Sequence, residues 1–306
     1  MPRFRRDLGL LGAAVLAASL AASLAALPAC SPERSAAPPA PSPTSPPPSP
    51  APTPTPAPRA TVIGVFGDWG IRGGRAADVV RLVNGWRPLD AVLTTGDNAY
   101  GRGQRDEAAF AASLVAPLRR RGVPFYASLG NHDVVTRDGR YVVDALRIPA
   151  HWYVRTVGPV EVVVLDSNRP SDGRQLAFLK GVLARPRAAF RVVVFHHPAS
   201  SCSLHGANRE VDRAWLPLFR GRVDAVLAGH NHTYERFDVG GVPYVTTGGG
   251  GARLYPSVPG LCNGPGKALR INTVYHAVRL TATPQRLTLE AVGLDGTAFD
   301  TVTVTR

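Results

Sequence analysis

Five short apolar runs in this chain each end in a residue that can bind a metal ion. With their polar ends they read VIGVFGD (62–68), AVLTTGDNAY (91–100), PFYASLGNH (124–132), VVVFHH (192–197) and AVLAGHNH (225–232). A short apolar run rich in β-branched residues predicts a buried strand. Because α/β sheets collect their ligands outside the carboxyl ends of the strands, we expect the five polar clusters to meet in one crevice.

The apolar runs alternate with segments of helical periodicity. We expect strands at 62–66, 91–95, 124–129, 160–165, 191–195 and 225–228, and helices near 74–86, 105–121, 174–184 and 211–219. This order predicts parallel strands joined by right-handed crossovers. After a flexible loop at glycines 248–251, the segments 274–282, 286–292 and 298–305 alternate in polarity and predict an antiparallel second sheet packed on the first.

The amino-terminal sequence predicts an exported protein with a spacer. Basic residues and then an apolar stretch precede Cys30, so residues 1–30 read as a signal peptide of the lipoprotein type, with lipid on Cys30 as a membrane tether. Ordinary cleavage, which releases a secreted protein, is the alternative, and Arg5 and Arg6 loosely resemble a twin-arginine signal. Residues 31–60 hold thirteen prolines and predict a disordered linker, which leaves 61–306 as the catalytic domain.

The net charge of +13 raises the question of a nucleic-acid partner. Of the 35 basic residues, 33 are arginines scattered along the chain, which favours solvated basic faces over a dedicated nucleic-acid site. With Cys30 assigned to lipid, Cys202 and Cys262 remain as a pair, and we hypothesise a disulfide between them in an oxidising compartment. The sequence does not indicate an oligomeric state.

The polar clusters supply more ligands than one metal ion needs. The candidates are Asp68, Asp97, Tyr100, Asn131, His132, Asp133, His196, His197, His205, His230 and His232. Oxygen and imidazole donors without thiolate suit iron, zinc or manganese. The surplus predicts two ions, and a two-ion site needs a carboxylate between them. Asp97 is the natural bridge.

In order, these clusters resemble the five motifs of the purple acid phosphatases, which belong to the calcineurin-like metallophosphoesterase superfamily. The motifs are Asp68-Trp69-Gly70, Gly96 to Tyr100, Gly130 to Asp133, Val193 to His196 and Gly229 to His232. The resemblance spans residues 62 to about 236. It implies an α/β fold, a four-layer α/β/β/α sandwich of two mixed β-sheets flanked by helices. Tyr100, three residues after Asp97, is typical of this branch.

The resemblance also implies the ligand sets. One ion, Fe(III), is held by Asp68, Asp97, Tyr100 and His232, and a divalent iron, zinc or manganese ion is held by Asp97, Asn131, His196 and His230. A phenolate is a hard anionic donor, so Tyr100 favours a trivalent ion. Such an ion acidifies its bound water strongly, which suits an acid phosphatase.

The reaction expected is hydrolysis of a phosphomonoester by attack of metal-bound hydroxide. Asn131 grips the phosphate, and His132 and His205 are the candidate substrate-side proton donors. His197 is either a substrate contact or a structural residue, and Asp133 is expected to orient His132 or a ligand. Trp69 either shapes the pocket or lies in the core, and His151 and His276 are surface or packing residues.

Two other functions stay open. A phosphodiesterase acting on nucleotides or phospholipid head groups uses the same kind of metal pair. A non-catalytic surface lipoprotein that captures phosphate or metal belongs to a different class, and the intact set of ligands and proton donors argues against it.

Overall fold

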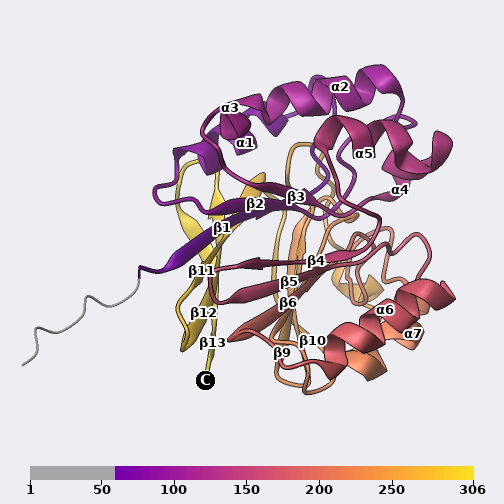
Figure 1. The fold of residues 1–306 in the computed structure, drawn as a ribbon, viewed down its shortest axis with the longest axis vertical. Helices are drawn as coiled ribbons and strands as arrows, with labels where there is room; N and C mark the ends of the chain where they lie inside the picture. Colours follow the sequence, from indigo (N-terminus) through magenta and orange to yellow (C-terminus); the bar gives the residue numbers. More distant parts are fainter. Residues whose placement is uncertain (1–58) are drawn as a thin grey trace, which may run out of the picture. The chain divides into compact units, whose positions relative to one another are not determined.

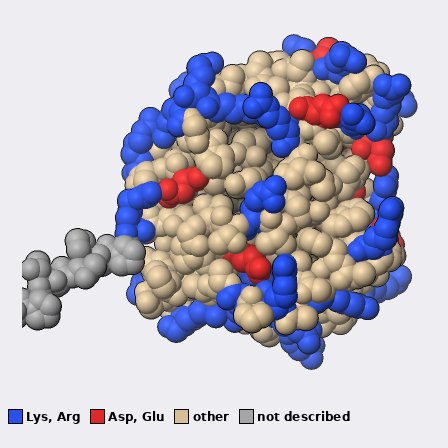
Figure 2. Space-filling view, viewed as in Figure 1, with Lys and Arg blue, Asp and Glu red and all other residues tan. Residues whose placement is uncertain are grey.

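The computed structural model describes residues 59–306. The predicted signal peptide, Cys30 and almost all of the predicted linker lie outside these residues. Among residues 59–306, no helix combines the length and apolarity that crossing a bilayer requires. In the view of Figure 2, lysine and arginine side chains are scattered over the face, most of them towards its margin, and do not gather in one basic patch.

Two β-sheets face each other and carry helices on their outer sides (Figure 1). The first sheet has the order β13-β12-β11-β1-β2-β3, and the second has the order β10-β8-β9-β7-β6-β5-β4. Helices α1 to α5 lie over the first sheet, and α6 and α7 lie over the second. The expected α/β/β/α sandwich of two mixed sheets is confirmed.

The bounds of the elements follow. The strands of the first sheet are β1 (Thr61–Phe66), β2 (Ala91–Thr94), β3 (Phe125–Ala127), β11 (His276–Ala282), β12 (Arg286–Gly293) and β13 (Ala298–Thr305). Those of the second are β4 (Tyr153–Val157), β5 (Val160–Val164), β6 (Phe190–Val194), β7 (Ala225–Ala228), β8 (Tyr234–Val239), β9 (Val242–Thr247) and β10 (Lys267–Asn272). The helices are α1 (Ala76–Gly85), α2 (Arg105–Leu114), α3 (Ala116–Arg120), α4 (Asn131–Val134), α5 (Arg140–Leu146), α6 (Gly173–Ala184) and α7 (Arg209–Phe219), with short 3₁₀ turns η1 (Arg137–Gly139) and η2 (Pro259–Leu261).

The central strands are apolar at consecutive positions because both of their faces are buried. In β5, Val162 and Val164 belong to the core between the two sheets. Val163, between them, joins Leu179 of α6 and Trp215 of α7 in a second core under the outer face. Successive side chains of a strand point to opposite faces, so one run of valines contributes to both cores. The second sheet therefore packs against the first sheet on one face and against α6 and α7 on the other.

The predicted division of strands between sheets is wrong. The first three predicted strands and the next three do not form one sheet, because β1 to β3 lie in the first sheet and β5 to β7 lie in the second. The carboxyl-terminal strands form no separate sheet, since β11 pairs antiparallel with β1, from Thr61 opposite Ala282 to Val65 opposite Val278. A run of buried apolar residues predicts a strand. It does not predict which other strand pairs with it, because that partner can lie far away in the sequence.

Two local predictions are also wrong. The helix expected at 105–121 is divided into α2 and α3 at Val115, and Pro117 stands in the first turn of α3, where proline is tolerated. Glycines 248–251 are buried, not a flexible loop. A Cβ on Gly250 would lie 2.1 Å from the carbonyl oxygen of Gly67. These glycines let the end of β9 approach the end of β1 closely, and Gly250 N donates to Gly67 O at 2.9 Å.

Candidate metal centre

Three of the candidate ligands stand at strand ends in left-handed backbone conformation. The φ angles are 59° at Asp68 after β1, 47° at Asp97 after β2 and 70° at His230 after β7. Residues other than glycine adopt such angles uncommonly, and the strain persists where the surroundings over-determine it. Here Asp68 N donates to Gly96 O at 3.0 Å, and His230 N donates to Asp68 Oδ2 at 2.9 Å. The three turns are thus bound to one another.

Asp68, Tyr100 and His232 form the first group of candidate ligands. Tyr100 Oη lies 2.7 Å from His232 Nε2 and 3.3 Å from Asp68 Oδ1. His232 Nδ1 donates to the carbonyl oxygen of Arg253 at 2.8 Å, which leaves Nε2 with its lone pair directed at the group. The phenol, the carboxylate and the imidazole therefore converge.

Asn131, His196 and His230 form the second group. His196 Nδ1 donates to Thr95 O at 2.9 Å, so its Nε2 carries the lone pair. That atom lies 3.0 Å from Asn131 Oδ1 and 3.2 Å from His230 Nδ1. Both Asn131 Oδ1 and His196 Nε2 are acceptors, and no proton on either atom joins them. A cation between the two atoms satisfies both lone pairs.

Asp97 lies beside both groups. Its Oδ1 is 3.5 Å from His196 Nε2 of the second group, and burial together with the charges of Asp68 and Asp97 raises the pKa of Tyr100 in the first group. Ligand atoms of Asp68, Asp97 and His196 all lie within 4.8 Å of one another. Gly130 leaves room for the carboxylate, because a Cβ there would come within 2.1 Å of Asp97 Oδ1.

The buried carboxylates of the site require a balancing positive charge. Burial raises the pKa of Asp68 well above its usual value, and the Asp97 charge raises it further. Burial likewise raises the pKa of Asp97. Burial lowers the pKa of His230 to about 2 and that of His232 to about 4, which makes both imidazoles neutral donors at pH 7. Closely spaced buried carboxylates beside neutral imidazoles are costly unless a positive charge balances them, so the residues fit a metal pair.

Two of the predicted substrate-side histidines, His197 and His205, lie beside His230 of the second group. The ring of His205 is 4.8 Å from that of His230, and the ring of His197 is 4.5 Å from it. His197 Nδ1 also contacts Ser167 Oγ at 2.9 Å, and burial lowers the pKa of His197 to about 4. His132 lies at the other group, with its ring 4.7 Å from the Tyr100 ring. Its Nδ1 donates to Gly101 O at 2.9 Å, and this bond does not use Nε2.

Asp133 has a different partner from the one expected. It does not orient His132 or a ligand side chain. Its Oδ2 accepts from the backbone N–H groups of Gly130 and Asn98, and its Oδ1 accepts from Ala99 N at 2.8 Å. The carboxylate thereby ties the turn after β2 to the start of α4. Trp69 is fully buried and donates to Asn98 Oδ1, which assigns it to the core.

Tyr255 was not predicted. Its hydroxyl donates to the carbonyl oxygen of His230 at 2.8 Å. Its ring lies 4.6 Å from the ring of His232 and 5.4 Å from that of His205. No motif marks this tyrosine, because it stands in an irregular loop far along the chain from the histidines that it contacts.

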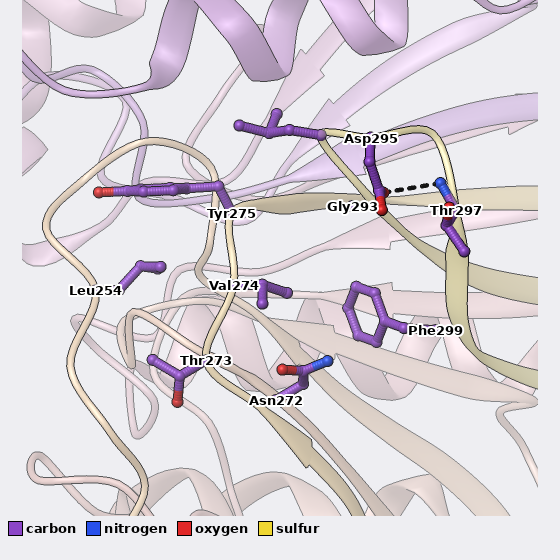
Figure 3. A pocket seen from close by; sticks show the side chains of 10 residues that line it. Leu254, Asn272, Thr273, Val274, Tyr275, Gly293, Asp295, Thr297 and Phe299 are labelled. Atoms are coloured by element: carbon purple, nitrogen blue, oxygen red, sulfur yellow. Dashed lines mark hydrogen bonds between the residues drawn. The ribbon is translucent and has the colours of Figure 1, made fainter.

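A pocket of about 480 Å³ is lined in part by Leu254, which belongs to the same loop (Figure 3). Apolar side chains of Leu254, Val274, Tyr275 and Phe299 line it, and Asp295 Oδ1 accepts from Thr297 N at its edge. None of the candidate ligands lines this pocket. It is therefore separate from the convergent donors, although Leu254 adjoins Tyr255.

The family profile described as calcineurin-like phosphoesterase matches residues 61–234, which include β1 to β7 and every candidate ligand. The chain belongs to the calcineurin-like phosphoesterase family. That membership identifies a phosphoesterase, as the motifs predicted.

Curated relatives of this phosphoesterase include purple acid phosphatases. Purple acid phosphatase 4 of Arabidopsis thaliana is 28% identical over 232 residues, which cover 61% of this chain and 67% of the relative. Tartrate-resistant acid phosphatase type 5 of Homo sapiens is 27% identical over 199 residues, covering 53% of this chain and 61% of the relative. The matches thus span about two thirds of the relatives' length.

Solved structures agree on the fold. Purple acid phosphatase PPD1 from yellow lupin superposes with a TM-score of 0.69 at 19% identity, covering 81% of this chain and 54% of the lupin chain. GAP50 of Plasmodium, described as the anchor in the inner membrane complex, superposes with a TM-score of 0.66 at 17% identity. The match covers 80% of this chain and 89% of the GAP50 chain. A fold shared by a phosphatase and an anchor leaves the function to be argued from the site.

Proposed function

We propose that this phosphoesterase is a binuclear metal-dependent hydrolase that cleaves phosphomonoesters, in the manner of a purple acid phosphatase. One observation carries the proposal: seven oxygen and nitrogen donors form two groups that share the Asp97 carboxylate. Three donors in each group, with Asp97 common to both, match the needs of two ions better than those of one.

The donor types suggest which ion each group holds. Asp68, Tyr100 and His232, with Asp97, present three oxygens that are anionic when ionised, and such a set favours Fe(III). Asn131, His196 and His230, with Asp97, present one anionic donor and suit divalent iron, zinc or manganese. When bound, the ions neutralise phosphate charge and acidify water to give the nucleophile.

The remaining residues act on the substrate. Asn131 orients a phosphate oxygen through its side-chain amide. His132 and His205, on opposite groups, hold protons for the departing alkoxide, and His197 contacts the phosphate. Tyr255 keeps the ring of His232 and the backbone of His230 in place.

Export of the protein is part of the proposal. Cys202 and Cys262 form a disulfide in the structure, as the sequence predicted. Disulfides persist in oxidising compartments, so the pair supports an extracytoplasmic enzyme. The signal sequence, the lipid on Cys30 and the tether of residues 31–60 complete this proposal from the sequence.

The test compares metal content with two substrates. Full-length protein is loaded with iron and zinc, its metal content is measured, and phosphate or phenol release is followed with 4-nitrophenyl phosphate and bis(4-nitrophenyl) phosphate between about pH 4 and pH 9. The expected result is two ions per chain and a higher kcat/KM for the monoester. A higher kcat/KM for the diester would establish a phosphodiesterase instead, and a metal-loaded protein that cleaves neither ester would establish a binding protein.

A further inference from the structure

Large apolar side chains are exposed beside the two histidines that we assign as proton donors. In residues 59–306 the exposed large apolar residues are Val135, Leu204, Val258, Leu261 and Leu269. Leu204 immediately precedes His205 and is 60% exposed. Val135 follows α4, which contains His132, and is 49% exposed. Exposed apolar residues are common singly, but four of five in the segments next to a site indicate a contact surface.

Leu204, Val258 and Leu261 belong to two loops that are fastened together. We call these three residues the apolar rim. Val258 N donates to Cys202 O at 2.7 Å, Leu261 N donates to Val258 O at 2.8 Å, and the disulfide joins Cys202 to Cys262. Ser201 and Asn263 add an antiparallel bridge. Because these bonds already hold the loops, binding at the rim costs little ordering entropy.

The rim is continuous with the site. His205, the residue after Leu204, has its ring 4.8 Å from the His230 ring. On the other loop, Tyr255 lies three positions before Val258 and packs against both His205 and His232. A ligand bound at His205 is therefore next to the exposed side chain of Leu204.

The position of the proton donor indicates which part of a substrate lies at the apolar rim. A general acid must stand within hydrogen-bond distance of the oxygen that leaves. The organic group attached to that oxygen therefore lies next to His205 or His132, whereas the phosphate lies over the ligands. Apolar residues flank both histidines, and an apolar organic group there gains from leaving water.

We propose that the apolar rim binds the organic part of the substrate and makes this enzyme selective for phosphate esters of apolar alcohols. The inference rests on the proposed phosphomonoesterase function and names its substrate class. Sugar phosphates and other esters of polar alcohols then gain nothing from Leu204 and Leu261.

The test uses n-alkyl phosphates from ethyl to hexyl, whose alcohols leave with nearly equal intrinsic ease. A fully buried methylene is worth about a fourfold gain and a half-exposed one about a twofold gain. We expect kcat/KM of the metal-loaded full chain to rise about twofold per methylene. Calorimetric titration with n-alkylphosphonates, which are not hydrolysed, should give the same trend in Kd.

Three variants locate the contact. The double variant Leu204→Ser/Leu261→Ser should lose the dependence on chain length and keep ethyl phosphate turnover within about twofold. Leu269→Ser is the matched control, because Leu269 is 46% exposed on β10 outside the two loops, and it should keep the full dependence. Leu254→Ser tests the separate pocket of Figure 3 and should also keep it.

The failures can be told apart. A flat series with active wild-type enzyme, a dependence that survives in the double variant, or its loss only in Leu254→Ser would each overturn the role of the rim and leave the phosphatase intact. Absence of phosphate release from every ester would overturn the proposed function. In that case the phosphonate titration still decides whether the rim binds an alkyl chain.

Discussion

Oδ1 of Asn131 lies 3.0 Å from Nε2 of His196, although 65 positions separate these residues in the chain. Asn131 starts α4 after a strand of the first sheet, and His196 follows β6 of the second sheet. The contact therefore joins the two halves of the sandwich. It brings two acceptor atoms together, an arrangement that is favourable only with a cation between them.

Replacement of the shared carboxylate tests the two-ion arrangement. In Asp97→Asn, we expect both ions to be lost and kcat to fall by about 10³-fold or more, because both groups of donors use this side chain. Metal analysis after gel filtration gives the occupancy. The metal-free variant should melt at a higher temperature than metal-free wild type, since burial raises the pKa of Asp97 and the amide removes that cost. Asp144→Asn, an exposed control, should keep both ions. Two ions retained in Asp97→Asn would contradict the bridge.

The phenol of Tyr100 tests the identity of the first ion. Iron(III) bound to a phenolate absorbs visible light, so Tyr100→Phe should bleach the oxidised iron enzyme and preserve the far-UV circular dichroism spectrum. Tyr255→Phe is the control, because its hydroxyl contacts the backbone of His230. It should keep the colour. An iron-loaded wild-type enzyme without a visible band would rule out Tyr100 as an iron ligand.

The two proton donors are separable from metal binding. His132→Gln and His205→Gln should each retain two ions and lose about 10²- to 10⁴-fold in kcat with alkyl phosphates. The loss should be much smaller with 4-nitrophenyl phosphate, because 4-nitrophenolate leaves without a proton. His151→Gln serves as the control outside the site. Equal losses with both substrates would indicate that the histidine positions phosphate and donates no proton.

The disulfide contributes to stability through the 60-residue separation of its cysteines. A loop of that length predicts about 4 kcal/mol of lost stability in Cys202→Ser/Cys262→Ser, measured by urea unfolding. The denatured, unreduced wild-type protein should show no reactive thiol from Cys202 or Cys262. Equal stability of wild type and the double variant would mean that the reduced loops are held by their hydrogen bonds alone.

Two histidines outside the site predict opposite responses to pH. Burial lowers the pKa of His276 to about 4, below that of the unfolded chain, so its stabilisation is present at pH 7 and is lost as the pH falls through the range from 6.5 to 4. Relative to His276→Gln, wild type should lose about 2–3 kcal/mol between pH 7 and pH 4.5.

His151 has the reverse sign. Its hydrogen bond to Asp166 raises its pKa above that of the unfolded chain, so its stabilisation is present at low pH and is lost as the pH rises through the raised pKa. Unfolding free energies of His151→Gln and wild type should therefore differ most in acid and least in base. A difference that grows with pH would contradict the ion pair.

The candidate ligands could be brought together from the sequence because most of them stand shortly after a buried strand. A strand that ends just before Asp68 or His196 places that side chain at the carboxyl edge of its sheet, whichever sheet the strand joins. The sheets themselves were not predictable in the same way. The pairing of β1 with β11, more than 200 residues later, depends on the edges left open after the chain has collapsed. Tyr255 was missed for a similar reason, since its role comes from a loop position that only the disulfide and the neighbouring hydrogen bonds define.

The pairing of β11 with β1 also determines where the chain can be truncated without exposing a strand edge. The family match ends at residue 234, and every candidate ligand lies before that point. A fragment trimmed there would lack β9 to β13 and all but the first residue of β8, and it would present β1 as a bare apolar edge next to Asp68. Open edges of this kind recruit strands from other molecules, so such a fragment would aggregate even though it retains the complete set of donors.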